Sequence, residues 1–489
     1  MSDKIRTTLR IEGSLLLVLA FSMVIPLLIA FFENETDCIR AFLLVIISCT
    51  ILGLILFTSF NLSRYKIKSR DGFLIVSISW FIASLIGSLP FILSGSIPSF
   101  ADAFFESCSG FTTTGSSILT DIEVLPRSIL FWRSFTHWLG GMGIIVFITA
   151  LLPVFGINGQ LIANSETTGP TKSKMLAKFS DVSRSLYKIY LAMTLAEFIL
   201  LKLGGLTWFD SAIHTFGTVG TGGLSSYNDS ISHFNSSYVE LVIAIFMLLA
   251  AINFGLYFTA RKRGILSILK DEEARFYLLI ITFVTAVIAF YNWAFDGFVQ
   301  IGEKLLNAFF QVVSIITTTG YMTDDFDAWP TFSRMMILCL FFIGGCSSST
   351  GGGVKAVRVL VALKLVRRGI SLKLHPNRIA PVTLNDRELG SDVTINISNF
   401  IFTYLTIIFA GALLLSINGY DFITNFTTSI SCIGNIGPGF NLTGPTMNYA
   451  FFSDFSKYIC SFLMITGRLE LFTVLTLFSK YYWNSDKVS

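Results

Sequence analysis

Residues 307–320 read NAFFQVVSIITTTG, and residues 102–115 read DAFFESCSGFTTTG. Two further segments share this pattern, DSAIHTFGTVGTG over residues 210–222 and NFTTSISCIGNIG over residues 425–437. Each segment begins at Asp or Asn, continues through mostly apolar residues and ends at a glycine. Because Asp and Asn are favoured N-caps, we predict that each first residue starts a short helix that ends at the Thr- and Gly-rich stretch. The repetition indicates internal symmetry in the fold.

The four segments are too short to cross a bilayer, because a membrane-spanning helix takes about 20 residues. A half-length helix followed by extended backbone is tolerated at membrane depth only where protein or a watery path surrounds it. We therefore interpret each segment as a re-entrant pore loop. Its helix would point a partially negative C-terminal end at the membrane centre, which favours a cation. The glycine that follows lets successive carbonyls face one axis, as they do in potassium filters.

Long apolar segments surround the four loops. The chain of 489 residues is 53% hydrophobic and 13% charged, with a mean hydropathy of +0.69, which is typical of a membrane protein. Apolar length predicts about ten spans, over residues 11–32, 39–60, 73–94, 128–155, 184–206, 237–260, 275–296, 333–366, 394–417 and 456–482. The predicted fold is an all-α polytopic membrane protein with four pseudo-symmetric helix, pore loop, helix repeats around a central pore. We divide it into an N-terminal helix pair (1–70) and repeats over 71–156, 157–263, 264–370 and 371–489.

Charged residues are distributed unevenly between the two sides of the predicted spans. Most of the 35 Lys and Arg lie at the termini and in the loops on the same side as the termini. By the positive-inside rule this side is cytoplasmic, so we expect both termini inside the cell. The opposite connections carry acidic residues, for example Asp121, Glu123 and Asp324. Most such residues only solvate a loop, although an acidic rim would also concentrate cations.

A stretch rich in glycine and serine, GGCSSSTGGG, occupies residues 344–353 inside the apolar segment 333–366. This composition predicts a break in the helix. Phosphate-binding loops are also rich in glycine, but no Ser or Thr follows Lys355, so the P-loop pattern fails. Irregular backbone at membrane depth needs protein or water around it, so we expect the stretch to cross the ion path. A kink without a function is the alternative.

Arg468 lies in the middle of the predicted span 456–482. An arginine there costs about 2.5–3.5 kcal/mol to insert, and such a charge seldom faces lipid. Arg468 either pairs with an acid such as Glu470 or faces the ion path, where its charge would repel cations and limit their flux.

Several motifs resemble the Trk/Ktr/HKT superfamily of potassium transporters, and most closely its TrkH-type members. Four of them coincide with the predicted loops: SGFTTTGSS, TVGTGGLSSYNDS, ITTTGYMTDDFDAWP and GNIGPG. Two more are GGCSSSTGGGVKAVRV in the third repeat and ITGRLELFTVLTLF in the fourth. The motifs occur in the order of the family, and the extra N-terminal helix pair is typical of its TrkH branch.

The resemblance implies potassium uptake across the inner membrane of a bacterium or archaeon. It assigns potassium binding to the filter residues Thr113, Thr114, Gly115, Gly220, Thr221, Gly222, Thr318, Thr319, Gly320, Asn435, Ile436 and Gly437. It also implies a gate below the filter, formed by Gly345, Cys346, Ser347, Ser348, Ser349, Thr350, Gly351 and Arg468. The implied partners are a second copy of the chain in a homodimer, membrane lipid and a cytosolic, TrkA-like nucleotide-binding regulatory ring. Potassium is the expected ligand, and neither an organic cofactor nor a nucleic acid is expected.

The loops differ in the residues before the final glycine, which predicts a pore that is only pseudo-symmetric. Loops one and three both contain TTTG, whereas the second has VGTG and the fourth NIGP. A secondary carrier or a sodium/potassium symporter is the alternative function. However, a carrier with a site at the membrane midplane typically has a pair of inverted repeats. An enzyme is not expected, because the four His include no H-E-x-x-H motif and the seven Cys include no C-x-x-C motif.

Overall fold

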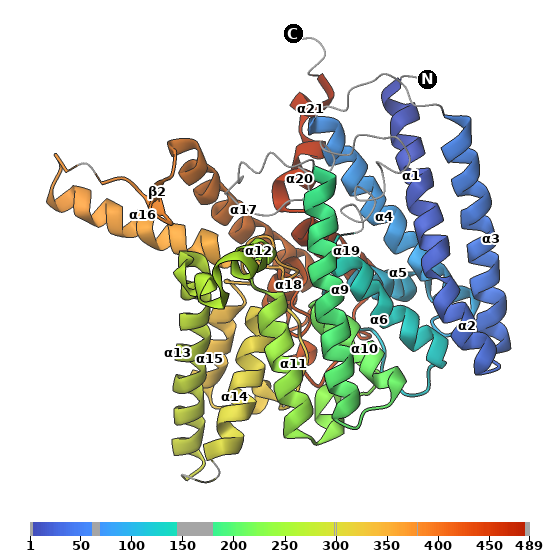
Figure 1. Ribbon diagram of the computed structural model, residues 1–489, viewed down its shortest axis with the longest axis horizontal. Helices are drawn as coiled ribbons and strands as arrows, with labels where there is room; N and C mark the ends of the chain where they lie inside the picture. The colour runs from blue at the N-terminus through green and yellow to red at the C-terminus, as the bar shows by residue number, and fades with distance from the viewer. Residues whose placement is uncertain are drawn as a thin grey trace.

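The computed structural model describes residues 3–60, 69–143, 179–297, 299, 301–378 and 380–484. Within these ranges the chain is built almost entirely of helices (Figure 1). Parts of two predicted basic loops, 64–70 and 172–188, and the end of the predicted span 128–155 lie outside the described residues. The described ranges include all four predicted pore loops.

The N-terminal helices form a hairpin at one edge of the molecule (Figure 1). They are α1 (Asp3–Ser22), α2 (Val24–Phe32) and α3 (Thr36–Ser59). Helix α1 packs closely along α3 where two glycines meet, since a Cβ on Gly13 would lie 3.0 Å from the carbonyl oxygen of Gly53. Both helices also contact α4 of the first repeat, so the hairpin is joined to the repeats.

Four units follow, each with a helix of 12 to 16 residues that leads into one of the predicted loops and is called a short helix below. This arrangement confirms the predicted architecture. The first contains α4 (Ser69–Leu93), α5 (Phe100–Phe111) and α6 (Arg127–Gly141). The second contains α9 (Phe179–Leu203), α10 (Trp208–Val219), α11 (Ser237–Ala250) and α12 (Phe254–Arg263). The third contains α13 (Glu272–Phe295), α14 (Ile301–Ile316), α15 (Thr331–Leu340) and α16 (Ala356–Leu374). The fourth contains α17 (Ser391–Leu415), α18 (Phe422–Gly434), α19 (Asp454–Arg468), α20 (Leu471–Leu475) and α21 (Lys480–Asn484).

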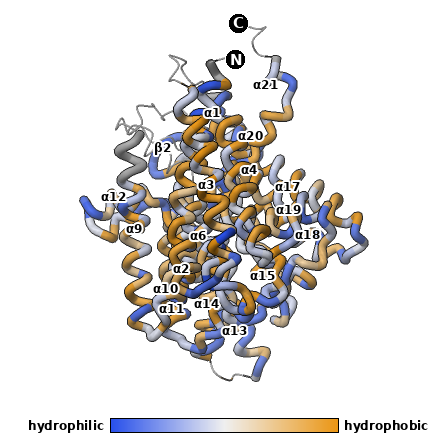
Figure 2. Tube along the Cα trace, turned by 90° about the vertical axis from the view of Figure 1, so that its right-hand side faces the viewer, coloured by the Kyte–Doolittle hydropathy of each residue, from blue (hydrophilic) through white to orange (hydrophobic). Residues whose placement is uncertain are grey.

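The short helices of three units each contact the unit that precedes them around a closed arrangement. Helix α10 packs on α6 of the first unit, and α14 packs on α11 of the second. Helix α5, in turn, packs on α19 of the fourth unit. The first unit therefore closes on the last. The described ends of the chain, in α1 and α21, lie at the same end of the molecule in both Figure 1 and Figure 2.

The described helices include fewer unbroken spans than the sequence predicts. Five are long and apolar enough to cross a membrane, or seven if each of two bent pairs counts as one span. Hydrophobic residues dominate long stretches of α1, α3 and α4 (Figure 2). The predicted spans 237–260 and 456–482 are each broken by a bend, since α11 and α12 meet at 94° and α19 and the segment Leu471–Phe478 at 114°. Both bends lie near the predicted gate, and the second places Arg468 at a helix end rather than in mid-span.

The predicted N-caps of the short helices are also wrong. The capping side chains are Ser99, Thr207 and Asp421, each of which accepts a hydrogen bond from the amide three residues later. Asp102, Asp210 and Asn425 therefore lie inside the first turns, and Asn307 lies well inside α14. A hydroxyl or carboxylate cap followed by an acid in the first turn is the more favourable arrangement, which the search for a first Asp or Asn overlooked.

A small hairpin is the exception to the helical fold. Strands β1 (Thr383–Leu384) and β2 (Arg387–Glu388) pair antiparallel between α16 and α17. They project from the same face as α16, far from the four short helices (Figure 1).

Candidate ion pathway

Each of the four short helices ends in the same backbone turn. In each turn one residue adopts a left-handed conformation, with φ of 54° at Thr113, 54° at Thr221, 61° at Thr318 and 52° at Asn435. The next amide donates a hydrogen bond of 2.7–3.0 Å to the carbonyl five residues earlier, as Thr114 does to Ser109. This pair of features is the Schellman turn that commonly ends helices. The four loops are thus equivalent in backbone geometry, not only in sequence.

Three of these left-handed residues are threonines, which carry a branched Cβ. A positive φ is a genuine outlier for such a residue and costs on the order of 1–3 kcal/mol. The strain is repeated at Thr113, Thr221 and Thr318 and is relieved only at Asn435, since asparagine tolerates this region well. Strained backbone of this kind persists where the surrounding structure enforces it, and it clusters at functional sites.

The loops close a ring through backbone contacts. Two residues after each left-handed residue, the chain has a glycine with positive φ. A Cβ on that glycine would clash with a carbonyl oxygen of the next loop. A Cβ on Gly115 would lie 2.1 Å from the Gly222 carbonyl oxygen, and one on Gly223 would lie 2.0 Å from that of Thr319. A Cβ on Gly320 would lie 2.3 Å from the Ile436 carbonyl oxygen, and one on Gly437 would lie 2.8 Å from that of Thr114. The order of contacts is one to two, two to three, three to four and four to one. Equivalent residues of the four loops therefore contact one another in a closed ring.

In the second loop the equivalent glycine is Gly223, so the predicted assignment of Gly222 to this position is wrong. Gly223 has a φ of +74°, whereas Gly222 is not among the glycines with positive φ. Gly222 instead occupies the position of Thr114 and Thr319 and presents its carbonyl to Gly115. The error arose because three glycines, at 220, 222 and 223, lie so close together that spacing alone did not identify the correct one.

The side chains at the filter position differ between the loops. The hydroxyls of Thr114 and Thr319 each lie 2.8 Å from the hydroxyl of the threonine two residues earlier. Their counterparts Gly222 and Ile436 have no hydroxyl. In loop four the side-chain amide of Asn435 instead donates to the Thr114 hydroxyl at 3.0 Å. The ring is therefore uniform in its carbonyls and unequal in its side chains.

Four polar side chains that the predicted site did not include bind the segments that follow the short helices. They are Glu106, His214, Gln311 and Thr428, which occupy equivalent positions in the four short helices. Glu106 accepts a hydrogen bond from the Ile118 amide at 3.0 Å and pairs with the buried Arg133 at 2.5 Å. Arg133 also donates to the Ser225 carbonyl at 2.8 Å, which ties loop one to loop two. The sequence could have indicated them, because Glu106, His214, Gln311 and Thr428 each lie nine residues before the glycine with positive φ in their loop.

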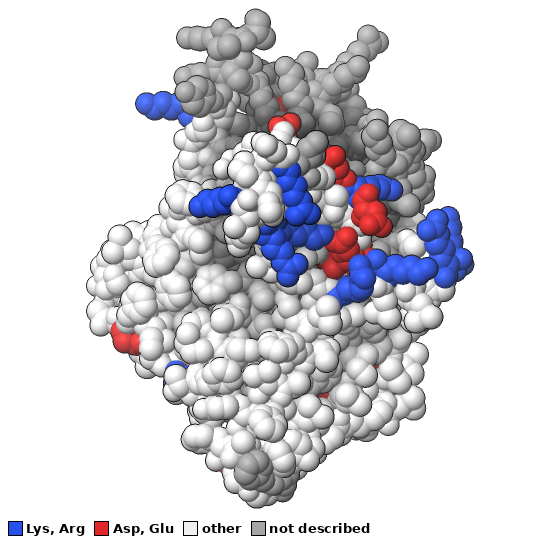
Figure 3. All heavy atoms as spheres, turned by 90° about the vertical axis from the view of Figure 1, so that its left-hand side faces the viewer, with Lys and Arg blue, Asp and Glu red and all other residues white. Residues whose placement is uncertain are grey.

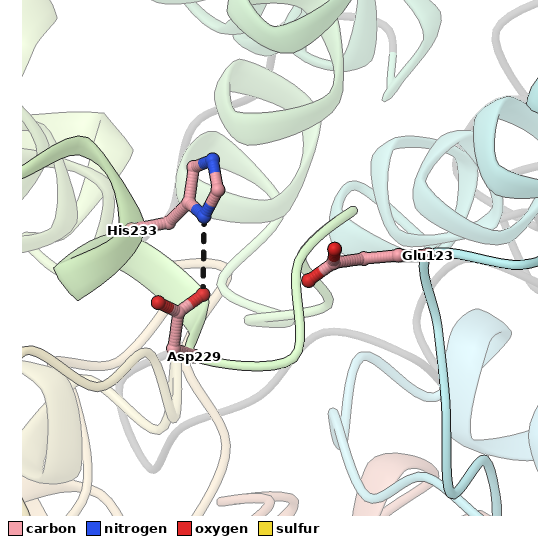
Figure 4. Close-up of side chains that lie close together, drawn as sticks. All are labelled: Glu123, Asp229 and His233. Carbon is pink, nitrogen blue, oxygen red and sulfur yellow. Dashed lines mark ion pairs between the residues drawn. The ribbon is translucent and has the colours of Figure 1, made fainter.

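An outer cavity adjoins the ring. It is lined by all four filter glycines and by Tyr227 and Asn228 of the second loop. Beside it, Glu123, Asp229 and His233 lie together on exposed loops of the first and second units (Figure 4). His233 Nδ1 lies 3.3 Å from Asp229 Oδ1, and Glu123 accepts a hydrogen bond from the Asn228 amide at 3.2 Å. The two carboxylates favour cations beside this cavity.

The predicted break in the third unit is present and lies against the inner end of the ring. Helix α15 ends at Leu340 and α16 begins at Ala356, with irregular backbone between them. The Gly352 amide donates to the Thr318 hydroxyl at 2.6 Å, and a Cβ on Gly352 would lie 2.4 Å from the Gly434 carbonyl oxygen. We call residues 344–353 the gate loop. It contacts the filter loops of the third and fourth units.

Most residues predicted for the gate have a described partner in the neighbouring helices. The Cys346 amide donates to Ala251 at 2.9 Å, and the Ser348 carbonyl accepts from Phe254 at 3.1 Å, so the loop is fixed at the bend between α11 and α12. The Ser349 hydroxyl donates back to the Cys346 carbonyl at 2.6 Å. Ser347 contacts Glu273 of α13, whereas Gly345 and Gly351 pack closely on Ala251 and on the Thr317 carbonyl. The loop thus joins the second and third units.

Arg468 joins three units below the ring. Its guanidinium donates to the carbonyls of Gly140 at 2.6 Å, Gly141 at 2.8 Å and Thr350 at 2.8 Å. Glu470, the acid considered as its partner, pairs instead with Arg358 at 2.7 Å. An inner cavity next to the gate loop is lined by Arg468, Arg358, Glu470 and Lys355.

Lys355 is a second cation below the ring that the sequence reasoning did not assign. Its side chain is buried, and its ammonium donates to the Gly351 carbonyl within the gate loop. The cavity lining therefore carries three cationic side chains and one carboxylate. This charge balance opposes the presence of a cation in the inner cavity.

Comparisons with known proteins agree with this geometry. A family model described as TrkH, cation transport protein, matches residues 39–489. The "Trk system potassium uptake protein TrkH" of Escherichia coli strain K12 is 35% identical over 98% of this chain and 99% of its own length. The protein of the same name from Halomonas elongata is 34% identical over 98% of this chain and 99% of its own.

A solved structure also matches the fold. The crystal structure of the potassium transporter TrkH from Vibrio parahaemolyticus has a TM-score of 0.88 and 32% sequence identity, covering 98% of this chain and 100% of that one. These relatives are named as transport proteins, which agrees with the prediction of a transporter rather than an enzyme. The chain belongs to the TrkH family of cation transport proteins.

Proposed function

We propose that this chain carries potassium ions into the cell across the cytoplasmic membrane, through the ring formed by its four loops. One observation carries the proposal: the carbonyls of Thr114, Gly222, Thr319 and Ile436 each abut a glycine of the neighbouring loop, in an order that closes on itself. A ring of carbonyls can replace the hydration shell of a potassium ion. The names of the relatives, which are potassium uptake proteins, support the same ion.

Potassium would be held mainly by backbone oxygens of the filter. These belong to Thr113, Thr114, Thr221, Gly222, Thr318, Thr319, Asn435 and Ile436, with Gly115, Gly223, Gly320 and Gly437 allowing the close approach. At the level of Thr114 and Thr319, side-chain hydroxyls come from loops one and three, because the equivalent residues of the other loops are Gly222 and Ile436. Strict selection of potassium would therefore rest on the geometry of the carbonyl ring.

The gate loop and Arg468 would control passage at the inner end. The loop lies against Thr317 and Gly434, at the start of two filter segments. Arg468 donates a hydrogen bond to the Thr350 carbonyl of the gate loop and adds positive charge beside the inner cavity. In this arrangement an ion leaving the filter meets backbone and a repulsive charge. We infer that the loop must move before ions pass.

The charged face of the molecule supports the proposed partners. Lys and Arg side chains gather over α12 and α16 (Figure 3), where Arg261, Lys262, Arg263, Arg367 and Arg368 are exposed. By the positive-inside rule this face would be cytoplasmic. It would meet the regulatory ring that the family resemblance implies, or the anionic headgroups of lipids. A homodimer is proposed on the resemblance alone.

Ion flux into proteoliposomes tests the proposed function. The purified chain is expected to take up potassium and rubidium well and sodium and lithium poorly, because the carbonyl ring would suit the larger ions. A chain that passes no potassium would contradict the proposal. Repeating the assay with an imposed proton or sodium gradient separates a channel from the alternative: uptake against the potassium gradient would show ion-coupled symport.

A further inference from the structure

A single buried carboxylate binds both the gate loop and the start of the helix that follows it. Glu273 lies in the first turn of α13, and only 5% of its surface is exposed. Its carboxylate accepts hydrogen bonds from the Ser347 amide at 2.5 Å and the Ser347 hydroxyl at 2.6 Å. It also accepts from the Val357 amide at 3.2 Å, which lies just beyond the other end of the loop. Ser347 in the loop and Val357 in α16 are thus held together by one side chain of a different helix.

These bonds belong to the strong class. Hydrogen bonds to an ionised acceptor are about twice as strong as those between neutral groups. Val357 lies in the first turn of α16, where amides lack partners within the helix and the helix dipole favours a negative charge. Glu273 therefore satisfies amides that the break between α15 and α16 would leave without acceptors.

The rest of the loop depends on this anchor for its position. Between Ser347 and Val357, Gly351 packs on the Thr317 carbonyl and Gly352 on the Gly434 carbonyl. Glycine allows more backbone conformations than other residues, so contacts of the residues on either side help to fix the position of Gly351 and Gly352. Other described contacts of the loop involve the backbone of Ala250, Ala251 and Phe254 and the side chains of Thr318, Lys355 and Arg468. Glu273 differs from these in binding both Ser347 within the loop and the first turn of α16 beyond it.

We propose that Glu273 is a positioning residue that keeps the gate loop beneath the filter and so holds the pathway closed. The inference rests on the proposed role of the loop as a gate. Loss of the carboxylate frees Ser347 from the start of α16, lowers the stability of the closed arrangement and raises the basal flux of potassium. The filter itself does not change, because the described contacts of Glu273 are with the gate loop and α16 rather than with the carbonyl ring.

A series of variants tests this role in full-length protein reconstituted into proteoliposomes, with rubidium uptake as the measurement. Glu273→Ala is expected to raise basal uptake about tenfold, since all three hydrogen bonds to the carboxylate are lost. Ser347→Ala removes one of the three bonds and should give a smaller rise. Glu272→Gln is the matched control: its carboxylate pairs with Lys364 and binds the Asn385 amide, so uptake should stay at the wild-type level.

Two further readouts separate positioning from general damage. The ratio of rubidium to sodium uptake should stay unchanged in Glu273→Ala, whereas a distorted filter would lower it. Hydrogen exchange at the amides of residues 345–352 should become faster in that variant and not in Glu272→Gln. If Glu273→Ala does not fold, Glu273→Gln keeps the shape of the side chain, and its uptake should then rise above that of the wild type.

Deletion of residues 345–351 distinguishes the two levels of the hypothesis. If the deletion raises uptake while Glu273→Ala and Glu273→Gln leave both uptake and exchange unchanged, the role of Glu273 is refuted and the gate stands. If the deletion leaves uptake unchanged, the gate itself is refuted, and the role of Glu273 falls with it.

Discussion

Gly223→Ala is expected to lower potassium uptake about 100-fold, because the added methyl group has no room. Its Cβ would lie 2.0 Å from the Thr319 carbonyl oxygen and 2.9 Å from the carbonyl carbon. Both are backbone atoms of the next loop, so loops two and three must move apart to make room for the methyl group. The φ of +74° adds strain, which for alanine costs about 1–2 kcal/mol.

A matched glycine separates the clash from the strain. Gly419 has a φ of +78°, yet a Cβ there would meet nothing within 4 Å. Gly419→Ala should therefore lose some thermal stability while keeping its uptake near the wild-type rate. The measurement is potassium uptake per folded protein, with folding checked by the melting temperature. Equal uptake in Gly223→Ala and Gly419→Ala would show that the contact between loops two and three plays no part in conduction.

Arg468→Ala is expected to raise potassium uptake about 10- to 30-fold. At an effective dielectric constant of about 20, a unit positive charge about 8 Å from a potassium ion costs about 2 kcal/mol. The substitution also removes the bond to the Thr350 carbonyl, which loosens the gate loop. The two effects act in the same direction, and uptake into proteoliposomes measures their sum.

Arg468→Lys distinguishes charge from anchoring. Lysine keeps the positive charge but lacks the planar guanidinium that reaches the Gly140, Gly141 and Thr350 carbonyls together. If repulsion dominates, uptake by the lysine variant should stay close to the wild type. If anchoring dominates, it should approach that of Arg468→Ala. An unchanged or lower uptake in folded Arg468→Ala would contradict the proposed role of this residue.

The repeated loops could be predicted from the sequence because their signal is local. A short apolar helix followed by a Thr- and Gly-rich stretch has few possible structures at membrane depth, so TTTG in two loops pointed directly to the fold. The break in the third unit was visible for the same reason, since five glycines in residues 344–353 prevent a continuous helix.

Other features depend on contacts between distant segments, which no local pattern reports. The glycine of loop two could be identified only from the positive φ of Gly223 and its contact with Thr319. The bend after Arg468 involves a positive φ of 61° at Glu470, whose carboxylate is held by Arg358 from another helix. Glu273 was hidden for a similar reason, although an acidic run at 271–273 within a basic loop was a signal that could have been pursued.

The central claim is that the cation is bound by the carbonyls of the four loops. Crystals of the protein grown in rubidium, whose anomalous scattering reveals the position of the ion, test this claim most directly. We predict an anomalous peak on the axis of the ring, within coordination distance of the carbonyl oxygens of Thr114, Gly222, Thr319 and Ile436. Rubidium bound elsewhere along the pathway, with no peak at these four oxygens in protein that conducts rubidium, would contradict the account.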